Sequence, residues 1–424
     1  MGTGRYAAGV RLAVLGTICG MVAGCGGSGS QGGSGATGNG PASPTAVTVS
    51  FYEGAPTAVA TKIGSSSFSL QTISSGKLTL SIPSGTTTFA VAYVCTGVED
   101  VFEASTADGT SFTVPCPAHV PSIPMGTLTG NVDISGVPGA NLANIDLNNG
   151  TFGFSAGLNP NTNFSISVPA GNDRVEIVAF NSSAQGLTAL AAKNFSNQPV
   201  PGALNGGAQV VLGAADLTTS PQSISYSNVP AGYSTPSVTA DFVFVAGGGF
   251  PVATGAQQYP VIPASGVVNG DFYEIFSYAK NAAKPTEMII CVKSVTTAGP
   301  VSFTYPIPWP YAGPTPAALP TFDLSYAGFT GKTGVFATGR ADWNNPAVGN
   351  FEFEIVASAN YMNGSTLLSF PDLSGLTGFV APPVSGTQVS WFASISQSTF
   401  GAPQPMPTNA TITTVENSGT YTAP

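Results

Sequence analysis

Alternation of apolar and polar residues with a period of two runs through almost the whole chain. It is clearest in "KLTLSI" (77–82), "NFSISV" (163–168), "NFEFEIVA" (350–357) and "TQVSWFASIS" (387–396). Successive side chains of a strand point to opposite faces, so this pattern predicts strands with one buried face. Turn sequences such as "PSG", "ADG" and "NNG" separate the runs. We therefore predict an all-β protein of tandem antiparallel β-sandwiches of immunoglobulin, transthyretin or fibronectin type.

One segment departs from this pattern. The sequence "GLTALAAKNF" (186–195) is rich in residues that favour helices. It predicts a short helix of two or three turns.

An internal repeat indicates tandem units. The segment "KLTLSIPSGTTTFAVAYVC" (77–95) aligns without gaps with "NFSISVPAGNDRVEIVAFN" (163–181), and a weaker third copy occupies 227–244. Proline ends the first strand because it lacks a ladder donor, and glycine permits the positive φ of a tight connection. Each copy therefore predicts a β-hairpin.

Proline-rich segments and the repeat divide the chain into units. The stretches 115–124 and 305–320 are rich in proline, and such segments are extended and stiff. The predicted boundaries are 1–24 signal peptide, 25–45 flexible Gly/Ser tether, 46–122 first sandwich, 123–219 second sandwich, 220–305 third β-rich domain, 306–320 proline-rich linker and 321–424 last sandwich.

The N-terminus has the pattern of an export signal. Arg5 and Arg11 precede an apolar run of about a dozen residues, too short for a membrane-spanning helix of about 20. The run ends in Val22-Ala23-Gly24-Cys25, which resembles the lipobox of bacterial lipoproteins. This resemblance implies cleavage before Cys25 and lipidation of Cys25, so we expect an exported, lipid-anchored protein. Gly26 resembles the residue of lipoproteins sent to the outer membrane, if the host has two membranes.

Three cysteines remain once Cys19 and Cys25 are assigned to the signal. Exported chains meet oxidising conditions, in which pairing is the default. Cys95 ends the apolar face of "FAVAYVC" and Cys116 ends that of "FTVPC". We predict a disulfide between them, worth about 3 kcal/mol on the chain-entropy model. Cys291 is expected to be a small buried residue of a strand.

Composition excludes several classes of function. Charged residues make up only 7% of the chain and its net charge is −9, so it lacks the basic surface that binds nucleic acid. The single histidine, His119, lies in a predicted linker, which disfavours a Ser-His-Asp triad and a histidine zinc site. The sequence contains neither a phosphate-binding nor a dinucleotide-binding glycine loop. We expect no cofactor and no metal.

Residues 126–180 resemble the carboxypeptidase regulatory-like, transthyretin-type β-sandwich. The matching positions are Gly130 and Val132, Pro138-Gly139-Ala140, and Val168-Pro169-Ala170-Gly171, with Phe164 where the family has tyrosine or phenylalanine after "DG". Here 161–163 replaces that turn. The resemblance implies a non-catalytic spacer or binding module of an extracellular protein.

Glu352 and Glu354 are the nearest approach to the carboxylate pair of a glycosidase. They lie about 6.6–7 Å apart on one strand face by the strand rise. Because they alternate with large apolar residues, we expect a solvent-facing charged surface that discourages edge pairing. A glycan-acting hydrolase using paired carboxylates is the alternative.

Two acidic segments are considered for calcium, but neither has the spacing of a known calcium loop. Solvated turns are the favoured interpretation. The residues are Glu99, Asp100, Glu103 and Asp108 in one segment, and Asp146, Asn148 and Asn149 in the other.

Tyr305, Trp309 and Tyr311 alternate with prolines in "YPIPWPY". Exposed rings would stack on a sugar or peptide ligand. The favoured alternative is that they pack the linker against its neighbour.

Together these features predict a non-enzymatic envelope or surface protein, attached to a membrane through its N-terminal lipid. Its role would be structural, adhesive or ligand-binding, with a glycan or a protein as the ligand. Besides the hydrolase, a second alternative is an accessory module of a periplasmic envelope assembly.

Overall fold

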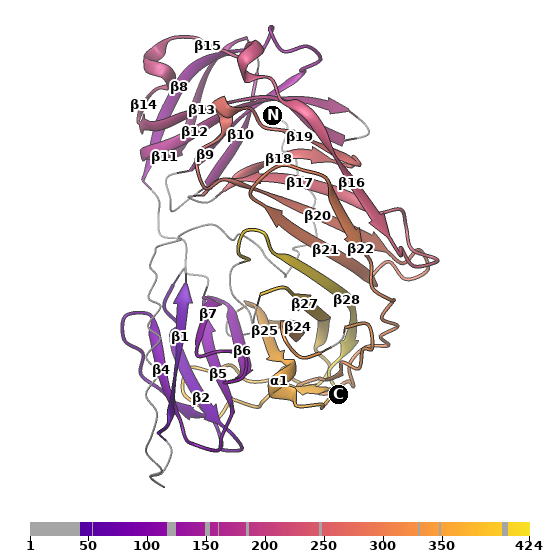
Figure 1. Cartoon of the computed structure of the whole chain (residues 1–424). Helices are drawn as coiled ribbons and strands as arrows, with labels where there is room; N and C mark the ends of the chain where they lie inside the picture. The colour runs from indigo at the N-terminus through magenta and orange to yellow at the C-terminus, as the bar shows by residue number, and fades with distance from the viewer. Residues whose placement is uncertain are drawn as a thin grey trace, which may run out of the picture.

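The computed structural model describes residues 43–52, 54–116, 124–148, 153–159, 161–183, 186–245, 248–329, 331–346, 349–400 and 406–424. Nearly all of their regular structure is β-strand, arranged in packed sheets (Figure 1), which confirms the predicted fold class. The predicted signal peptide, Cys25 and nearly all of the predicted tether lie outside the described residues, as does His119. Within the described ranges no helix is long and apolar enough to cross a membrane.

The first sandwich packs a three-stranded sheet, in the order β4–β1–β7, onto strands in the order β3–β2–β5–β6. Its core lies between the two layers, where Leu80 and Ile82 of β4 share a cluster with Phe89 and Val91 of β5. The strands are β1 (Thr45–Tyr52), β2 (Ala58–Ile63), β3 (Ser69–Leu70), β4 (Lys77–Ile82), β5 (Thr88–Cys95), β6 (Val98–Ser105) and β7 (Ser111–Pro115).

The second sandwich has the same plan, with a small sheet around β8 and β11 packed on the layer β10–β9–β12–β13. Its strands are β8 (Met125–Asp133), β9 (Leu142–Asn148), β10 (Gly153–Leu158), β11 (Asn163–Pro169), β12 (Gly171–Ser183), β13 (Gly186–Val200), β14 (Gly202–Ala203) and β15 (Val210–Val211). The short 3-10 helices η1 (Leu204–Gly207) and η2 (Ala214–Asp216) follow.

The third and fourth units share the largest hydrophobic cluster of the molecule. The third contains β16 (Thr219–Ser227), β17 (Ser237–Val243), β18 (Gly249–Thr254), β19 (Gln258–Val261), η3 (Ala264–Gly266), β20 (Phe272–Lys280), β21 (Met288–Val295) and β22 (Val301–Thr304). The fourth contains β23 (Thr321–Asp323), β24 (Val335–Asn345), β25 (Gly349–Ser358), α1 (Ala359–Met362), β26 (Leu367–Ser369), β27 (Gln388–Ser398) and β28 (Thr411–Thr422).

The large layers of all four units join into one 16-stranded sheet. Along this sheet the units follow the order second, third, fourth, first, so the first sandwich lies beside the last unit of the chain (Figure 1). The junctions are β13–β18, β21–β28 and the parallel pair β25–β6. Because neighbouring units share this sheet, the sheet itself does not mark where one domain ends and the next begins. The predicted domain boundaries therefore remain predictions.

The part of the fused sheet formed by β24 and β25 has one buried apolar face and one polar face. In β24 and β25, Trp343, Phe351 and Phe353 belong to the shared core. Their neighbours Asp342 and Glu352 point to the other face, as the period of two requires. This polar face carries the candidate site described below.

The predicted hairpins of the repeat are wrong. In the first copy β4 pairs with β1, whereas β5 pairs with β2 and β6. In the second copy β11 pairs with β8, whereas β12 pairs with β9 and β13. The Pro-x-Gly segment therefore carries the chain from one layer of a sandwich to the other. The two copies of the repeat therefore have equivalent structures. In each copy, however, the segment between the two strands crosses from one sheet to the other and does not form a hairpin turn.

The predicted helix at 186–195 is also wrong, because these residues form the first part of β13. β13 pairs with β12 along its whole length. Ala189, Ala191 and Ala192 are fully buried between neighbouring layers. Pairing with β12 and burial of the small alanine side chains thus outweigh the local preference for a helix.

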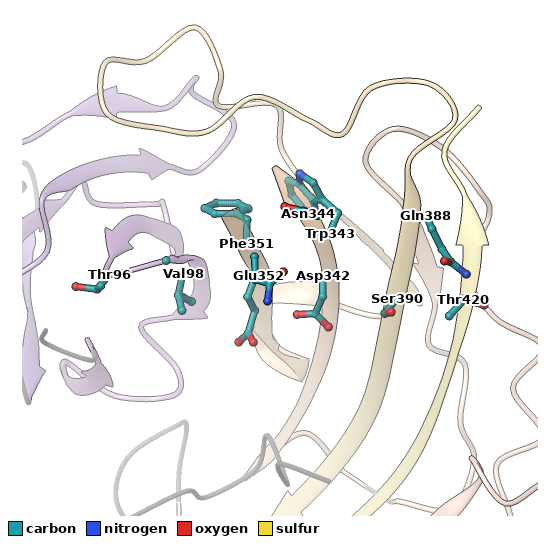
Figure 2. Close-up of a pocket in the computed structure, with 12 residues that line it drawn as sticks. Thr96, Val98, Asp342, Trp343, Asn344, Phe351, Glu352, Gln388, Ser390 and Thr420 are labelled. Atoms are coloured by element: carbon teal, nitrogen blue, oxygen red, sulfur yellow. The ribbon is translucent and has the colours of Figure 1, made fainter. Parts of the chain in front are cut away.

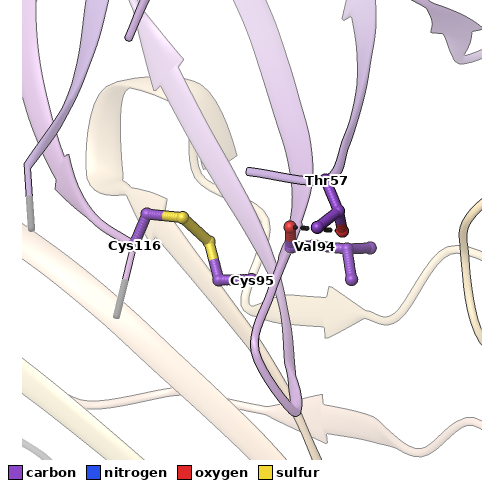
Figure 3. Close-up of a disulfide and its surroundings, with 4 residues drawn as sticks. All are labelled: Thr57, Val94, Cys95 and Cys116. Carbon is purple, nitrogen blue, oxygen red and sulfur yellow. Dashed lines mark hydrogen bonds between the residues drawn. A yellow bond between two sulfur atoms is a disulfide. The ribbon is translucent and has the colours of Figure 1, made fainter. Parts of the chain in front are cut away.

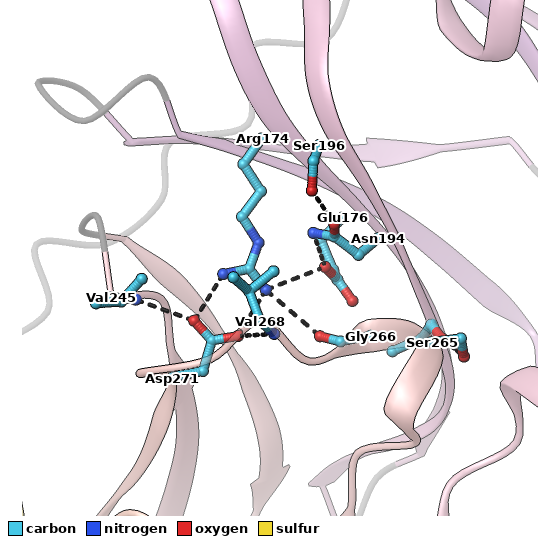
Figure 4. Close-up of polar contacts among 10 residues, drawn as sticks. Arg174, Glu176, Asn194, Ser196, Val245, Ser265, Gly266, Val268 and Asp271 are labelled. Atoms are coloured by element: carbon cyan, nitrogen blue, oxygen red, sulfur yellow. Dashed lines mark hydrogen bonds and ion pairs between the residues drawn. The ribbon is translucent and has the colours of Figure 1, made fainter.

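A buried ion pair joins the second sandwich to the third unit (Figure 4). The Arg174 guanidinium donates to both carboxylate oxygens of Asp271, at 2.7 and 2.8 Å. Asp271 also accepts the backbone N–H groups of Val245 and Val268. The guanidinium lies 3.9 Å from the centroid of the Phe244 ring. We call this junction the arginine seam.

The first sandwich and the fourth unit meet through carboxyl groups of the first sandwich. Glu99 accepts the backbone N–H of Val380 at 2.9 Å. Asp108 accepts the side chains of Ser358 and Asn360, at 2.5 and 2.6 Å, across 250 and 252 positions of sequence. These donors are neutral. We call this junction the carboxyl seam.

Candidate functional site

Five strands from the first sandwich and the fourth unit set one row of side chains across the polar face. Backbone register aligns Val98 of β6 with Glu352 of β25, Glu352 with Asp342 of β24, Asp342 with Ser390 of β27, and Ser390 with Thr420 of β28. Directly opposed residues have Cβ atoms about 4.5–5.5 Å apart. The row is therefore a nearly continuous strip of carboxyl and hydroxyl groups.

A second row runs parallel to the first, two residues further along each strand. It consists of Asp100, Glu354, Arg340, Phe392 and Ser418. On the other side of the first row, Asn350 opposes Asn344, and Gln388 opposes Thr422. We call the surface formed by these rows the polar platform.

A groove with a volume of about 610 Å³ lies on this platform (Figure 2). That volume is within the range of sites that bind small molecules. In Figure 2 the carboxyl groups of Asp342 and Glu352 point the same way, and the Trp343 and Phe351 rings lie at the opposite end of the view. The lining residues are Thr96, Gly97, Val98, Asp342, Trp343, Asn344, Asn350, Phe351, Glu352, Gln388, Ser390 and Thr420.

Arg340 holds the two groove carboxyls together. Its Nε lies 3.3 Å from Asp342 Oδ2 and its Nη1 lies 3.7 Å from Glu352 Oε2. Asp342 and Glu352 are directly opposed residues of β24 and β25. Burial raises the pKa of Asp342 to about 6, against the lowering effect of Arg340. Both carboxyl side chains remain about one-third exposed, so a ligand in the groove can reach them.

The second row contains carboxyl groups that are less accessible to water. Burial, then the nearby Glu352, raises the pKa of Glu354 to about 8. Burial also raises the pKa of Asp100 well above its ordinary value, with Glu354 as the next cause. Asp100 is hydrogen-bonded to Tyr93. Glu354 therefore retains its proton near neutral pH, and the pKa of Asp100 is shifted in the same direction.

The expected solvent face of Glu352 and Glu354 is corrected in two respects. Both side chains are half-buried in the junction between two units. β25 is not an edge strand, since β24 and β6 pair with its two sides. The sequence pattern identified the apolar face correctly, because Phe351, Phe353 and Ile355 are buried. It could not show that a strand from residues 98–105 would cover the other edge.

The structure buries the aromatic residues considered as ligand contacts. Tyr305, Trp309 and Tyr311 are 2%, 3% and 9% exposed and belong to the shared core. Trp309 stacks on Tyr311 with centroids 4.6 Å apart, and its indole N–H donates to the carbonyl of Ser325. No free ring face is left for a sugar. The structure thus shows the packing alternative, with the proline-rich segment forming part of the core.

The disulfide between Cys95 and Cys116 is confirmed (Figure 3). Their Cα atoms are 5.5 Å apart, and both side chains lie in the core of the first sandwich. Beside them, the Thr57 hydroxyl donates to the carbonyl of Val94. Cys291 is a buried free thiol in β21, as expected, and burial raises its pKa to about 12.

The acidic segments considered for calcium have other contacts. Glu99, Glu103 and Asp108 form hydrogen bonds across the carboxyl seam, to Val380, Tyr361 and Ser358 respectively. Asp146 is buried in β9, where it opposes Ser155 of β10. Asn149 lies outside the described residues. In the described part of the chain no three histidine, cysteine, aspartate or glutamate side chains form a group that could hold a metal ion.

Sequence reasoning missed most of the platform. Arg340 and Asp342 alternate with small residues in "GRADW", and Ser390 and Gln388 alternate with Val389 and Trp391. The alternation indicated that these side chains share outward faces. Nothing in the sequence indicated that these two strands would pair with each other in the same sheet as β6.

No protein-family model matches the sequence, and no curated protein is similar to it. Among solved structures, the chain was matched to one described as a Ca2+-stabilized adhesin that helps an Antarctic bacterium reach out and bind ice. The identity is 9%, the match covers 91% of this chain and 99% of that chain, and the TM-score is 0.12. A TM-score of this size does not establish a common fold, so the match gives no information on function.

Proposed function

We propose that the protein is an exported, lipid-anchored, non-enzymatic surface protein that binds a carbohydrate on the polar platform. The observation that carries this proposal is the groove, in which amide, hydroxyl and carboxyl groups from the four strands β24, β25, β27 and β28 face one open space. Sugars present many hydroxyl groups, and such side chains supply both donors and acceptors for them. The carbohydrate would be held by hydrogen bonds, with no buried charge required.

Export and anchoring rest on the N-terminal sequence and on the disulfide. Val22-Ala23-Gly24-Cys25 has the pattern of a lipidation signal. A disulfide such as Cys95–Cys116 is typical of proteins that fold in oxidising compartments. The platform would then be displayed at the membrane to which Cys25 is attached, the outer membrane in a host with two membranes.

A binding role suits the carboxyl groups better than hydrolysis. Glycosidases separate their two carboxyl groups by about 5–5.5 Å or by about 6.5–9.5 Å, so that the scissile bond lies between them. Asp342 and Glu352 instead oppose each other on neighbouring strands and both contact Arg340. This arrangement supports a fixed acceptor surface.

The anchor is tested by intact mass and detergent partitioning of the protein from its native host, beside Cys25→Ala. We expect the wild type to lack residues 1–24, to carry the mass of a diacylglycerol and an acyl chain, and to enter the detergent phase. The variant should stay in the aqueous phase. An unmodified, water-soluble wild type would overturn the anchoring.

The groove is tested by sedimentation of the mature chain carrying Cys25→Ala with cellulose, chitin, starch granules and peptidoglycan sacculi. We expect retention on at least one of them, and loss of retention in Gln388→Ala/Ser390→Ala. The matched control is Ser225→Ala/Gln258→Ala, which changes exposed positions of β16 and β19 outside the groove. Equal retention of both double variants would contradict binding at the platform. Release of soluble sugars would favour the hydrolase instead.

A further inference from the structure

The groove has a charge asymmetry. Its two partly exposed carboxyl groups, those of Asp342 and Glu352, accompany a single guanidinium, that of Arg340. Both distances from Arg340 to its carboxyl partners exceed 3.2 Å, so neither contact is a short charge-assisted hydrogen bond. The partly exposed carboxyl oxygens therefore have capacity for a further cationic donor.

This asymmetry restricts the chemistry of the ligand. A phosphate, a sulfate or a uronic acid would bring like charge onto the carboxyl groups, which is unfavourable. Arg340 offers it little compensation, since the guanidinium already lies between Asp342 and Glu352. A neutral sugar would be neither attracted nor repelled by the charge of the carboxyl groups. An ammonium group would form the same kind of hydrogen bonds and would also be attracted by the negative charge of the carboxyl groups.

We propose that the carbohydrate bound on the polar platform carries free amino groups, as a polymer of 2-amino sugars does. The inference rests on the proposed function and names its ligand class. One ammonium would lie over the Asp342–Glu352 pair and donate to both carboxyl groups. The amides of Asn350 and Gln388, with the Ser390 hydroxyl, would take the neighbouring sugar hydroxyls.

The test compares two probes that differ only at the amino position, where one carries a free amine and the other an uncharged acetamide. They are the β-1,4-linked hexasaccharides of glucosamine and of N-acetylglucosamine. Each is titrated calorimetrically into the mature chain carrying Cys25→Ala at about pH 7, which is above the pKa of about 6 of Asp342 and at which part of the free amines remains protonated. We expect the glucosamine oligomer to bind at least tenfold more tightly. The ratio should fall with added salt, because the carboxyl groups are partly exposed.

Two variants locate the effect. Asp342→Asn and Glu352→Gln keep the size and the hydrogen-bonding capacity of the side chains but remove a charge. Each should reduce the preference for the glucosamine oligomer to less than threefold, while binding of the acetylated oligomer changes little. The control is Glu274→Gln, a half-buried carboxyl of β20 outside the groove, which should keep the full preference. Thermal melts of all variants check that they are folded.

The outcomes separate the two proposals. Equal affinity for both hexasaccharides would overturn the amine preference and leave carbohydrate binding intact. Tighter binding of the acetylated oligomer would do the same. If neither hexasaccharide binds and no polysaccharide retains the protein, the proposed function fails together with this inference. A preference that survives both charge-removing variants would show that the amine is bound elsewhere.

Discussion

The arginine seam and the carboxyl seam each join two neighbouring units of the protein. The first contains a buried ion pair, whereas the second contains carboxyl groups with neutral donors. In the first, Asp271 is fully buried but receives the Arg174 guanidinium and two backbone N–H groups. In the second, Glu99 is equally buried but receives one backbone N–H, and its other oxygen has no hydrogen-bond partner. Accordingly, burial raises the pKa of Glu99 to about 7.

The difference shows how a buried acid is tolerated with and without a cation. Desolvation of a carboxylate must be balanced by a partner charge, or the group keeps its proton. The arginine seam uses the first solution. The carboxyl seam uses the second, since Glu99 and Glu103 both have a pKa raised to about 7 by burial. The carboxyl seam should therefore respond to pH through Glu99 and Glu103. The arginine seam should respond at higher pH, through Glu176, which lies 3.5 Å from Arg174 and whose pKa burial raises to about 8.

The largest effect is expected from breaking the arginine seam. Arg174→Ala leaves Asp271 buried without its cation, which should lower the free energy of unfolding by about 3–5 kcal/mol. Urea denaturation at neutral pH measures it. The double variant Arg174→Met/Asp271→Leu removes the charges together and should recover much of the loss. A loss below about 1 kcal/mol in the single variant would show that the pair is not what holds this seam.

Removal of the disulfide should have the next largest effect. The pair closes a segment with a sequence separation of 21 residues, so Cys95→Ser/Cys116→Ser should lower stability by about 3 kcal/mol on the chain-entropy model. The loss should appear first in the first sandwich, whose seam has no buried ion pair of the Arg174–Asp271 kind among the described contacts. Hydrogen exchange of β1 and β4 measures it. Wild-type protein treated with reductant should behave like the variant, and unchanged exchange in both would contradict the expectation.

A pH titration should separate the two seams. The folded pKa of Glu99 lies above its ordinary value of 4.5, so the folded state holds a proton that the unfolded state releases. The stabilisation is complete below about pH 4.5 and is lost as pH rises toward about 7. Glu99→Gln should remove on the order of 2 kcal/mol of this decline.

Thermal unfolding from pH 4.5 to 8 measures this decline. Asp133→Asn, in an exposed carboxyl whose pKa is lowered by Ser135, should leave the profile in this range unchanged. Parallel profiles for wild type and Glu99→Gln would refute the assignment of protons to the carboxyl seam.

The smallest effect is expected from an ion pair of the second sandwich in which the acid, Asp216, is buried but the lysine is exposed. Lys193 lies 3.6 Å from Asp216, but its side chain is 36% exposed. Lys193→Ala should therefore cost less than about 1 kcal/mol, and less still in high salt. Denaturation beside Arg174→Ala measures the contrast. A similar loss in both variants would mean that burial does not explain the strength of the arginine seam.

The strands themselves could be predicted because their information is local. In β4, Leu78, Leu80 and Ile82 alternate with polar residues and are buried as expected. The faces of Cys95 and Cys116 predicted their disulfide for the same reason. Which strands pair with each other does not depend on the residues within one strand alone. The Pro-x-Gly connections of the repeat are compatible with a hairpin or with a crossover, and only packing of the two layers selects the crossover.

The platform was beyond prediction for a related reason. Glu352 could be placed on an outward face, but its neighbours Val98 and Asp342 come from other strands, one of them in a distant unit. The segment at 186–195 shows the opposite error, in which a local helix preference yielded to pairing with β12.

By itself, the sequence determined the class of fold, the faces of the strands, the disulfide and the absence of a basic surface, since each depends on residue type and short-range periodicity. The tertiary structure alone decided that the first sandwich lies beside the last unit, through the parallel pair β6–β25. Backbone pairing is insensitive to side-chain identity at each position, so many strand orders are compatible with the same alternation. Burial of whole faces selects among them, and that selection creates both seams and the groove.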